Sequence, residues 1–247
     1  MIRNYIFTPK KVLSKYLEQK GIDIIDLNIS KNIIITHNPE LATKIASLCS
    51  ADIVREWVYH PYYPLFYTEF GNKDLSIAAI RVGAPAATLQ LEELIALGVQ
   101  NIIRIGLACS ISENLKIGDL VTSKGYLSLE GTSKYYGGSE YITAAFDNNF
   151  YNYLISSSIT SSLGVSIDAP YMETKQLFSI LQKKGYEFVD MEGAALHSVC
   201  NFRGVNLTDL LIINNESIKD WDIVFSGRKI VLDQAVQIVC DYFQQRS

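Results

Sequence analysis

The chain has 247 residues, of which 48% are hydrophobic and 19% are charged. These values exclude a disordered chain and allow one large domain whose core needs neither disulfides nor a metal. The formal net charge of -4 leaves no basic surplus to neutralise a phosphate backbone, so no nucleic-acid partner is expected.

Short β-rich runs alternate with helical patterns from end to end, which predicts an α/β fold built on a mixed or parallel sheet. The run 32–36, Asn-Ile-Ile-Ile-Thr, is continuous and β-branched, as a strand buried on both faces should be. Further strands are expected at 66–70, 75–82 and 101–105, and helices at 40–49 and 88–97. Gly71-Asn72 predicts a turn, and Gly98 a helix end.

The second half of the chain continues the pattern with strands expected at 119–123 and 207–213 and a helix at 231–243. The stretch 131–138, rich in Gly, Ser and Tyr, is expected to be a long functional loop. The stretch 156–162 contains five serines, but its apolar neighbours favour a helix over a linker. No internal repeat or domain boundary is visible, so one domain over residues 1–247 is expected.

The four cysteines lie far apart in apolar segments, with no spacing typical of a zinc site or a redox pair. We therefore expect reduced, mostly buried thiols and no metal. The N-terminal segment lacks the apolar stretch of a signal peptide, and no run of about eighteen apolar residues occurs. These features predict a cytoplasmic protein with no membrane partner.

Three segments contain residues that packing alone does not explain. In 82–88, Val-Gly-Ala-Pro-Ala-Ala-Thr, small residues let backbone N–H groups approach an anion, although a tight turn explains them equally well. Arg104 interrupts an apolar strand and must be paired in a salt bridge or reach a ligand, which we expect at the strand end. Asp190 and Glu192 precede a helix, where they either complement its dipole or accept hydrogen bonds from a polyhydroxylated ligand.

Taken together, the motifs VGAPAAT, RIG and DMEGAA, in this order, resemble the nucleoside phosphorylase family of purine nucleoside and uridine phosphorylases. The resemblance extends from about Ile33 to the C-terminus. It implies one α/β domain with a mixed central sheet and a distorted barrel flanked by helices. It also implies cleavage of the N-glycosidic bond of nucleosides, with phosphate or water as nucleophile and with no cofactor. The family assembles as homodimers or as hexamers that are trimers of dimers.

Sugar and phosphate contacts follow from matched positions of this resemblance. Arg104 matches the family's phosphate-contacting arginine, and the nucleophile is expected near it. Glu192 is expected on the ribose hydroxyls, with Asp190 beside it and Met191 under the sugar. Thr88 matches the helix-start segment near sugar and phosphate.

The resemblance also implies the base contacts. Tyr171 is the aromatic residue available as a wall for the base, with Pro170 where several relatives have Phe, although ordinary packing explains Tyr171 equally well. Asn214 and Asn215 stand where purine phosphorylases have an Asp that protonates the leaving base. An Asn cannot act as a general acid but can hydrogen-bond the base, so Asn214 is expected to stabilise the departing base.

The phosphate site departs from the family pattern. His37-Asn38-Pro39 replaces a Gly-Asp-Pro turn, and Leu41 stands where an arginine is expected. Leu107 replaces a Ser or Thr, and no arginine stands near His60-Pro61, where a partner-supplied one is expected. Because charge-assisted hydrogen bonds dominate phosphate recognition, we expect weak or absent phosphate dependence. A nucleoside hydrolase and a catalytically silent nucleoside-binding relative remain alternatives.

Two further expectations concern the histidines and the assembly. His60 and His197 could shuttle protons, but a lone histidine more often occupies a surface or a satisfied core site. The aromatic-rich segment 57–70 is too apolar for a solvated loop. Family members use this region at a dimer interface, so at least a homodimer is expected.

Overall fold

The computed structural model describes residues 5–71, 73–144, 149–217 and 228–244. Its strands are β1 (Asn32–Thr36), β2 (Asp52–Ile53), β3 (Leu65–Phe70), β4 (Lys73–Ala79), β5 (Asn101–Ser110), β6 (Leu120–Leu129), β7 (Tyr141–Thr143), β8 (Thr160–Ile167), β9 (Tyr186–Asp190) and β10 (Asn206–Glu216). Its α-helices are α1 (Pro9–Glu18), α2 (Pro39–Leu48), α3 (Ala84–Ala96), α4 (Asn149–Ser156), α5 (Lys175–Lys183), α6 (Gly193–Arg203) and α7 (Arg228–Gln244). Short 3-10 turns are η1 (Ile24–Asp26), η2 (Ser133–Tyr136) and η3 (Pro170–Met172).

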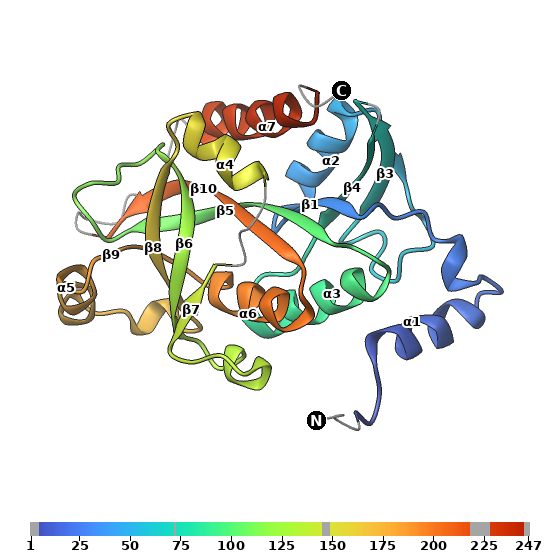
Figure 1. The fold of residues 1–247 in the computed structure, drawn as a ribbon, viewed down its shortest axis with the longest axis horizontal. Coiled ribbons are helices and arrows are strands. Elements are labelled where there is room, and N and C mark those ends of the chain that lie inside the picture. Colours follow the sequence, from blue (N-terminus) through green and yellow to red (C-terminus); the bar gives the residue numbers. More distant parts are fainter. Residues whose placement is uncertain (1–4, 72, 145–148, 218–227, 245–247) are drawn as a thin grey trace.

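All of these strands belong to one mixed sheet, in the order β10-β6-β8-β9-β5-β1-β4-β3-β2, with β7 on β6. β10 also pairs with β5, so β5, β9, β8, β6 and β10 close into a five-stranded barrel. Helices α2, α4 and α7 lie on one side of the strands and α1, α3 and α6 on the other (Figure 1). The expected fold class, a mixed central sheet with a distorted barrel flanked by helices, is confirmed.

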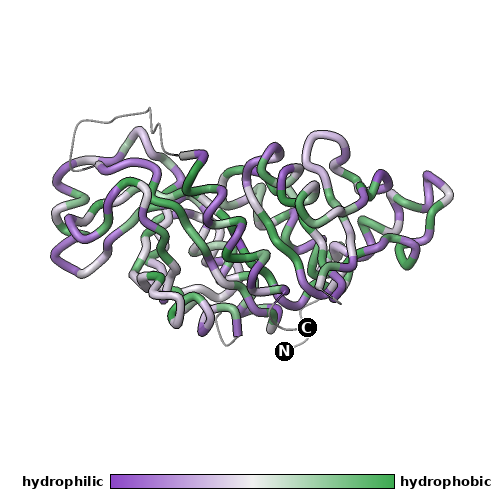
Figure 2. The backbone as a smooth tube through the Cα atoms, turned by 90° about the horizontal axis from the view of Figure 1, so that it is seen from above, coloured by the Kyte–Doolittle hydropathy of each residue, from purple (hydrophilic) through white to green (hydrophobic). Residues whose placement is uncertain are grey.

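β1 illustrates why the apolar runs form the centre of the sheet. Ile34 packs into the core on the side of α2 and α7, whereas Ile33 and Ile35 pack into the core formed with α1, α3 and α6. Both faces of this strand are therefore buried, as its continuous β-branched sequence predicts. Figure 2 shows hydrophobic segments passing through the middle of the molecule, and Figure 1 shows α1 toward one end of its long axis.

The serine-rich stretch 156–162 is not a helix, and that prediction is wrong. α4 ends at Ser156, and β8 begins at Thr160. The two serines at the start of the strand have partners on other elements: Ser162 donates to Glu187 Oε2 of β9 at 2.6 Å, and the Ser161 hydroxyl lies 2.9 Å from that of Tyr151 on α4. The local pattern did not contain these partners.

Three element boundaries also differ from expectation. α3 begins at Ala84, four residues before Thr88, because Gly83 adopts a positive φ of 91° and Pro85 is tolerated in the first helical turn. β5 continues to Ser110, so Arg104 lies in the middle of the strand and not at its end. The loop expected at 131–138 contains the turn η2. Asn72 of the expected turn lies outside the described residues.

Candidate functional site

A cavity of about 490 Å³ opens where β1, β5 and β10 end. These three strands run parallel, so their carboxyl ends meet at one edge of the sheet. The turn after β1, the second half of β5, the segment joining β9 to α6, the end of β10 and Leu232 of α7 contribute its walls. Segments that are distant in the sequence therefore line one cavity.

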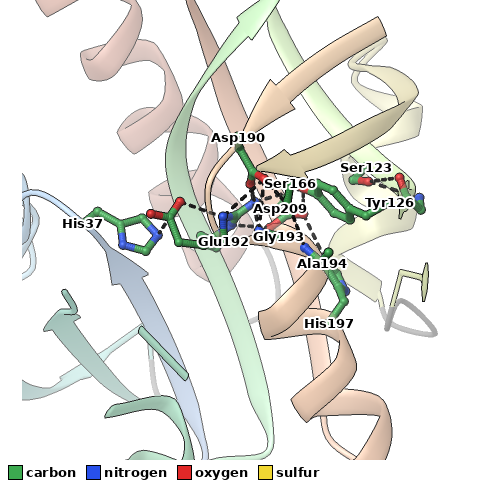
Figure 3. A network of polar contacts seen from close by, with 12 residues as sticks. His37, Ser123, Tyr126, Ser166, Asp190, Glu192, Gly193, Ala194, His197 and Asp209 are labelled. Carbon is green, nitrogen blue, oxygen red and sulfur yellow. Dashed lines mark hydrogen bonds and ion pairs between the residues drawn. The ribbon is translucent and has the colours of Figure 1, made fainter. Parts of the chain in front are cut away.

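Glu192 is the buried acid at the centre of this arrangement, between β9 and α6 (Figure 3). Its Oε1 accepts a hydrogen bond from the backbone N–H of Gly83 at 2.7 Å. Its Oε2 lies 3.8 Å from His37 Nε2 and 4.0 Å from Arg104 Nη1. The VGAPAAT and DMEGAA segments therefore meet through this carboxylate, which keeps one oxygen for a ligand.

Arg104 is buried, does not line the cavity and is held by a set of acceptors. Its Nε donates to Asp209 Oδ1 at 2.6 Å, and Nη2 donates to Asp190 Oδ2 at 2.7 Å and to the Tyr126 hydroxyl at 2.9 Å. Burial alone would lower the pKa of Arg104, but the neighbouring acids outweigh it and raise the pKa above its usual value. The guanidinium is therefore paired with two buried acids, within the strand and not at its end.

Asp209 is the partner directly opposite Arg104 in the parallel pair β5–β10. Its Oδ2 also accepts from Tyr126 at 2.6 Å and lies 2.9 Å from His197 Nε2. Burial opposes ionisation of Asp209, but the charges of Arg104 and His197 hold its pKa below the usual range. His197 is thus a satisfied core histidine, as its more common interpretation predicts.

Asp190 joins this network to the start of α6. Its carboxylate accepts from the Ser166 hydroxyl at 2.5 Å and from the backbone N–H of Gly193 at 2.9 Å. Burial raises the pKa of Asp190, and Arg104 offsets part of that effect. The carboxylate therefore satisfies the helix N-terminus and fixes the backbone that carries Glu192.

His37 is the only histidine in the described lining, and a neutral imidazole has one nitrogen that can accept a proton. Its Nδ1 lies 2.9 Å from the carbonyl oxygen of Arg81, which fixes the ring. Its Nε2 is buried and has no hydrogen-bond partner in the described structure. Figure 3 shows His37 beside Glu192, at the left end of the network as drawn.

The described lining contains neither Lys nor Arg. It does contain three acids, Glu173, Asp190 and Glu192. Leu41 and Leu107, at positions where phosphate contacts were expected, both line the cavity and offer no polar side-chain atom. The described part of the lining therefore carries acidic groups and no cationic side chain.

Five of the predicted site residues line this cavity together: Asp190, Met191, Glu192, Asn214 and Asn215. Asn214 and Asn215 belong to β10 itself, which extends to Glu216, beyond the end expected at 213. Asn214 Oδ1 is buried and has no partner in the described structure, so the cavity presents an acceptor near the β10 end.

Three predicted residues lie outside the cavity, and one of them is Arg104, which is buried in the network described above. Thr88 is buried on α3 and borders a separate hollow with Tyr135 and Lys134. Tyr171, on η3, has 90% of its surface exposed, and its neighbour Pro170 lines the cavity instead.

Sequence reasoning missed Asp209, Tyr126 and the position of His37. Asp209 left a signal, because an acid inside the apolar run 207–213 requires a buried cation just as Arg104 requires an anion. Tyr126 left none, since a tyrosine in a strand fits ordinary packing. His37 stands where the family has a glycine, and no local pattern shows that its ring lies beside Glu192.

Metal and thiol chemistry receive no support from the described part of the chain. No cluster of three or more His, Cys, Asp or Glu side chains suited to a metal occurs there. All four cysteines are free thiols, and burial raises the pKa of Cys109, which lines the cavity, to about 11. Within the same residues, no helix combines the length and apolarity required to cross a bilayer.

Comparison with known proteins places this geometry among characterised enzymes. A family model described as the phosphorylase superfamily matches residues 31–241. The chain is 26% identical over 243 residues to a uridine phosphorylase of Thermococcus kodakarensis, covering 89% of this chain and 86% of that protein. It is 27% identical over 185 residues to a guanosine phosphorylase of Halorubrum lacusprofundi, covering 70% and 73%.

Among solved structures, a purine nucleoside phosphorylase from Toxoplasma gondii in complex with immucillin-H aligns with a TM-score of 0.74. The alignment covers 89% of this chain and 93% of that chain at 20% sequence identity. The likeness establishes a shared fold.

Proposed function

Since the chain belongs to the phosphorylase superfamily, we propose that it binds a nucleoside in the cavity at the strand ends and cleaves the N-glycosidic bond. We further propose that this cleavage has weak or absent dependence on phosphate. The nucleoside is the substrate, phosphate is at most a weak co-substrate, and no cofactor takes part.

The sugar is proposed to bind at Glu192 and Met191. Glu192 Oε1 is occupied by the Gly83 N–H, so Oε2 is the oxygen available to accept from a ribose hydroxyl. A carboxylate that is fixed in this way loses little entropy when it binds a diol. Asp190 acts as a positioning residue for Glu192, because its bonds to α6 define the backbone at 192–193.

The base is proposed to lie near Asn214 and Asn215. The unpartnered, buried Oδ1 of Asn214 supplies an acceptor, and its amide nitrogen supplies donors for the departing base. Thr88 and Tyr171 lie outside the cavity, so we assign them no direct contact with the nucleoside.

The observation that carries the phosphate part of the proposal is the state of Arg104. Its Nε and Nη2 are bound by Asp209, Asp190 and Tyr126, and its Nη1 faces Glu192. To bind phosphate, the guanidinium would have to exchange carboxylate partners inside a buried network, and no second Lys or Arg lines the described cavity. A hydrogen bond to a charged group contributes about 1.5–3 kcal/mol, so this deficit weakens any phosphate site considerably.

Cleavage in such a cavity stretches the ribosyl–base bond toward an oxocarbenium-like state. Positive charge then develops on the sugar, close to the carboxylate of Glu192. The acidic lining stabilises that charge more than it stabilises the neutral nucleoside, which is the condition for lowering a barrier. The four free thiols agree with a reducing compartment, and we propose the cytoplasm as the location.

A nucleoside panel tests this function. Purine and pyrimidine ribonucleosides would be incubated with the purified protein in phosphate-free buffer, and free base would be measured by chromatography. We expect release of base from at least one nucleoside. A nucleoside that raises the unfolding temperature but is never cleaved would instead identify a catalytically silent binding protein.

A further inference from the structure

We infer that His37 is the catalytic base of this site: its Nε2 takes a proton from the water that attacks the sugar. The inference rests on the proposed function and assigns its nucleophile. It derives from an imidazole nitrogen that the described structure leaves buried, facing the cavity and without a hydrogen-bond partner.

The ring of His37 is held in the orientation that a base requires. The Arg81 carbonyl can only accept, so the Nδ1 atom 2.9 Å from it must carry the hydrogen. In the neutral ring this leaves Nε2 as the lone-pair nitrogen. Asn38 then begins α2 by accepting from the N–H groups of Glu40 and Leu41, which fixes the turn that carries the imidazole.

The distance between His37 and Glu192 places this nitrogen at the reacting carbon. Nε2 lies 3.8 Å from Glu192 Oε2, the oxygen proposed to accept from a ribose hydroxyl. In a ribonucleoside the 2′-hydroxyl stands on the carbon next to C1′. A water molecule held by Nε2 is therefore within reach of C1′ when the sugar occupies Glu192.

Acidic side chains lie around the imidazole. Glu192 faces it directly, and Asp190 and Glu173 line the same cavity. Arg104 approaches Glu192 at 4.0 Å, but its charge is shared with buried acids of β9 and β10.

Among the described residues, neighbouring elements add no cation that lines the cavity at Nε2. The guanidinium of Arg81 lies over the Tyr59 ring, 4.7 Å from its centroid. Glu40, at the start of α2, is exposed to solvent and does not line the cavity.

The step balances without a further reactant. The water oxygen bonds to C1′ while its proton passes to Nε2, and the C1′–N bond breaks with its electron pair leaving on the base. The base takes a proton from solvent, and Nε2 returns its proton to solvent. The sum is nucleoside plus water giving ribose and free base.

The decisive variant is His37→Asn. The Asn amide can keep the bond to the Arg81 carbonyl but has no atom at the Nε2 position that accepts a proton. We expect kcat for base release in phosphate-free buffer to fall by roughly 100-fold to 10,000-fold, with KM changed only a few-fold. We also expect the wild type to lose rate toward acidic pH and His37→Asn to show no such loss. Glu40→Gln, a nearby charge change outside the cavity, should keep the wild-type rate and pH profile.

Several results would overturn the inference, and each is distinct from failure of the proposed function. If the wild type releases no base, the proposed function itself fails. If the wild type releases base and His37→Asn matches its rate and pH profile, the assignment of His37 is wrong. It is also wrong if Glu173→Gln, and not His37→Asn, removes the acidic limb. Should His37→Asn unfold, His37→Gln provides the same comparison, because it likewise lacks a proton-accepting nitrogen.

Discussion

The two carboxylate oxygens of Glu192 have different tasks, and one substitution separates them. Glu192→Gln can keep an oxygen for the Gly83 N–H while removing the charge at Oε2. A hydrogen bond to a charged group is worth about 1.5–3 kcal/mol, so we expect ribonucleoside affinity to fall about 10-fold to 150-fold. Calorimetric titration of a ribonucleoside measures this change, and circular dichroism should show an intact fold.

The matching 2′-deoxynucleoside supplies the control for this prediction. It lacks a hydroxyl that the carboxylate accepts from, so its affinity should change less in Glu192→Gln. Equal affinity of mutant and wild type for the ribonucleoside would contradict the placement of the sugar.

Arg104 contributes to stability through its pairing with Asp209 and Asp190. Arg104→Met leaves both carboxylates buried without their cation, and we expect a loss of about 3–5 kcal/mol in the free energy of unfolding at neutral pH. Denaturant titration measures this loss. Arg203→Met, which removes a partly exposed arginine paired with Glu92, should cost about 0–1 kcal/mol.

The same network predicts a pH dependence. Asp209 titrates near 3.9 in an unfolded chain, whereas Arg104 and His197 hold its pKa below that range in the folded protein despite its burial. The stability that the ionised carboxylate contributes is therefore complete above about pH 4 and is lost as the pH falls toward the folded pKa. Arg104→Met should lose less stability on acidification than the wild type. If the free energy of unfolding falls with pH at the same slope in the wild type and in Arg104→Met, between about pH 6 and pH 3, this pairing is contradicted.

The residues of the site differ in how far the sequence could predict them. Met191 and Glu192 belong to the continuous motif DMEGAA, which can be recognised from neighbouring residues alone, and both line the cavity. The partners of Arg104 come from β6, β9 and β10, and no local pattern reveals that Asp209 falls opposite it. Tyr171 and Thr88 belong to matched segments, but neither residue lines the cavity that these segments border.

At the level of elements, the junction between β9 and α6 depends on close packing against β6. A Cβ atom built on Gly193 would collide with the Tyr126 ring. Tyr126 cannot move freely, because it donates to Asp209 and accepts from Arg104. We therefore expect Gly193→Ala to cost about 1–3 kcal/mol in the free energy of unfolding, measured by denaturant titration.

Gly131→Ala is the matched control for this substitution. Its Cβ would meet only Asp168 Oδ2, at 3.7 Å, which is an ordinary contact. A change in stability near zero is expected there. If the two variants lose equal stability, the loss reflects the general effect of replacing glycine and not the contact with Tyr126.

A helix or strand could be predicted where burial follows a regular pattern along its own residues. It could not be predicted where its polar side chains are satisfied by partners far away in the sequence. β1 and α2 follow from their own residues, since continuous apolar runs and amphipathic spacing report burial directly. The β8 strand was mistaken for a helix because its polar residues are satisfied by Glu187 and Asp190, which come later in the chain. The extensions of β5 and β10 have the same origin, since each strand continues because the other pairs with it.

For the whole molecule, the expected homodimer stays a prediction. Within the segment proposed for the interface, Trp57 is buried at 1% exposure, whereas Tyr62 remains 80% exposed. Apolar surface in this segment is thus partly used inside the chain and partly left at its surface. Sedimentation velocity at micromolar concentration should give at least a dimer, and a hexamer built as a trimer of dimers also agrees. A monomer would contradict the prediction.

The closed barrel was predictable only through the resemblance. Alternating strands and helices indicate an α/β fold. The pairing of β10 with both β5 and β6 joins strands that are far apart in the sequence, so no local pattern indicates it. The same closure places the end of β10 beside the turn after β1 and creates the cavity. The α/β class therefore followed from the residues, whereas the barrel and the expected position of the site followed from the resemblance to the family.

The measurement that tests the account most directly is a phosphate titration with identification of the sugar product. Base release from the preferred nucleoside would be followed from phosphate-free buffer into the millimolar range, and the sugar identified by mass spectrometry. We predict a rate that does not depend on phosphate, with ribose as the product. Saturable activation by sub-millimolar phosphate, with ribose 1-phosphate as the product, would contradict it.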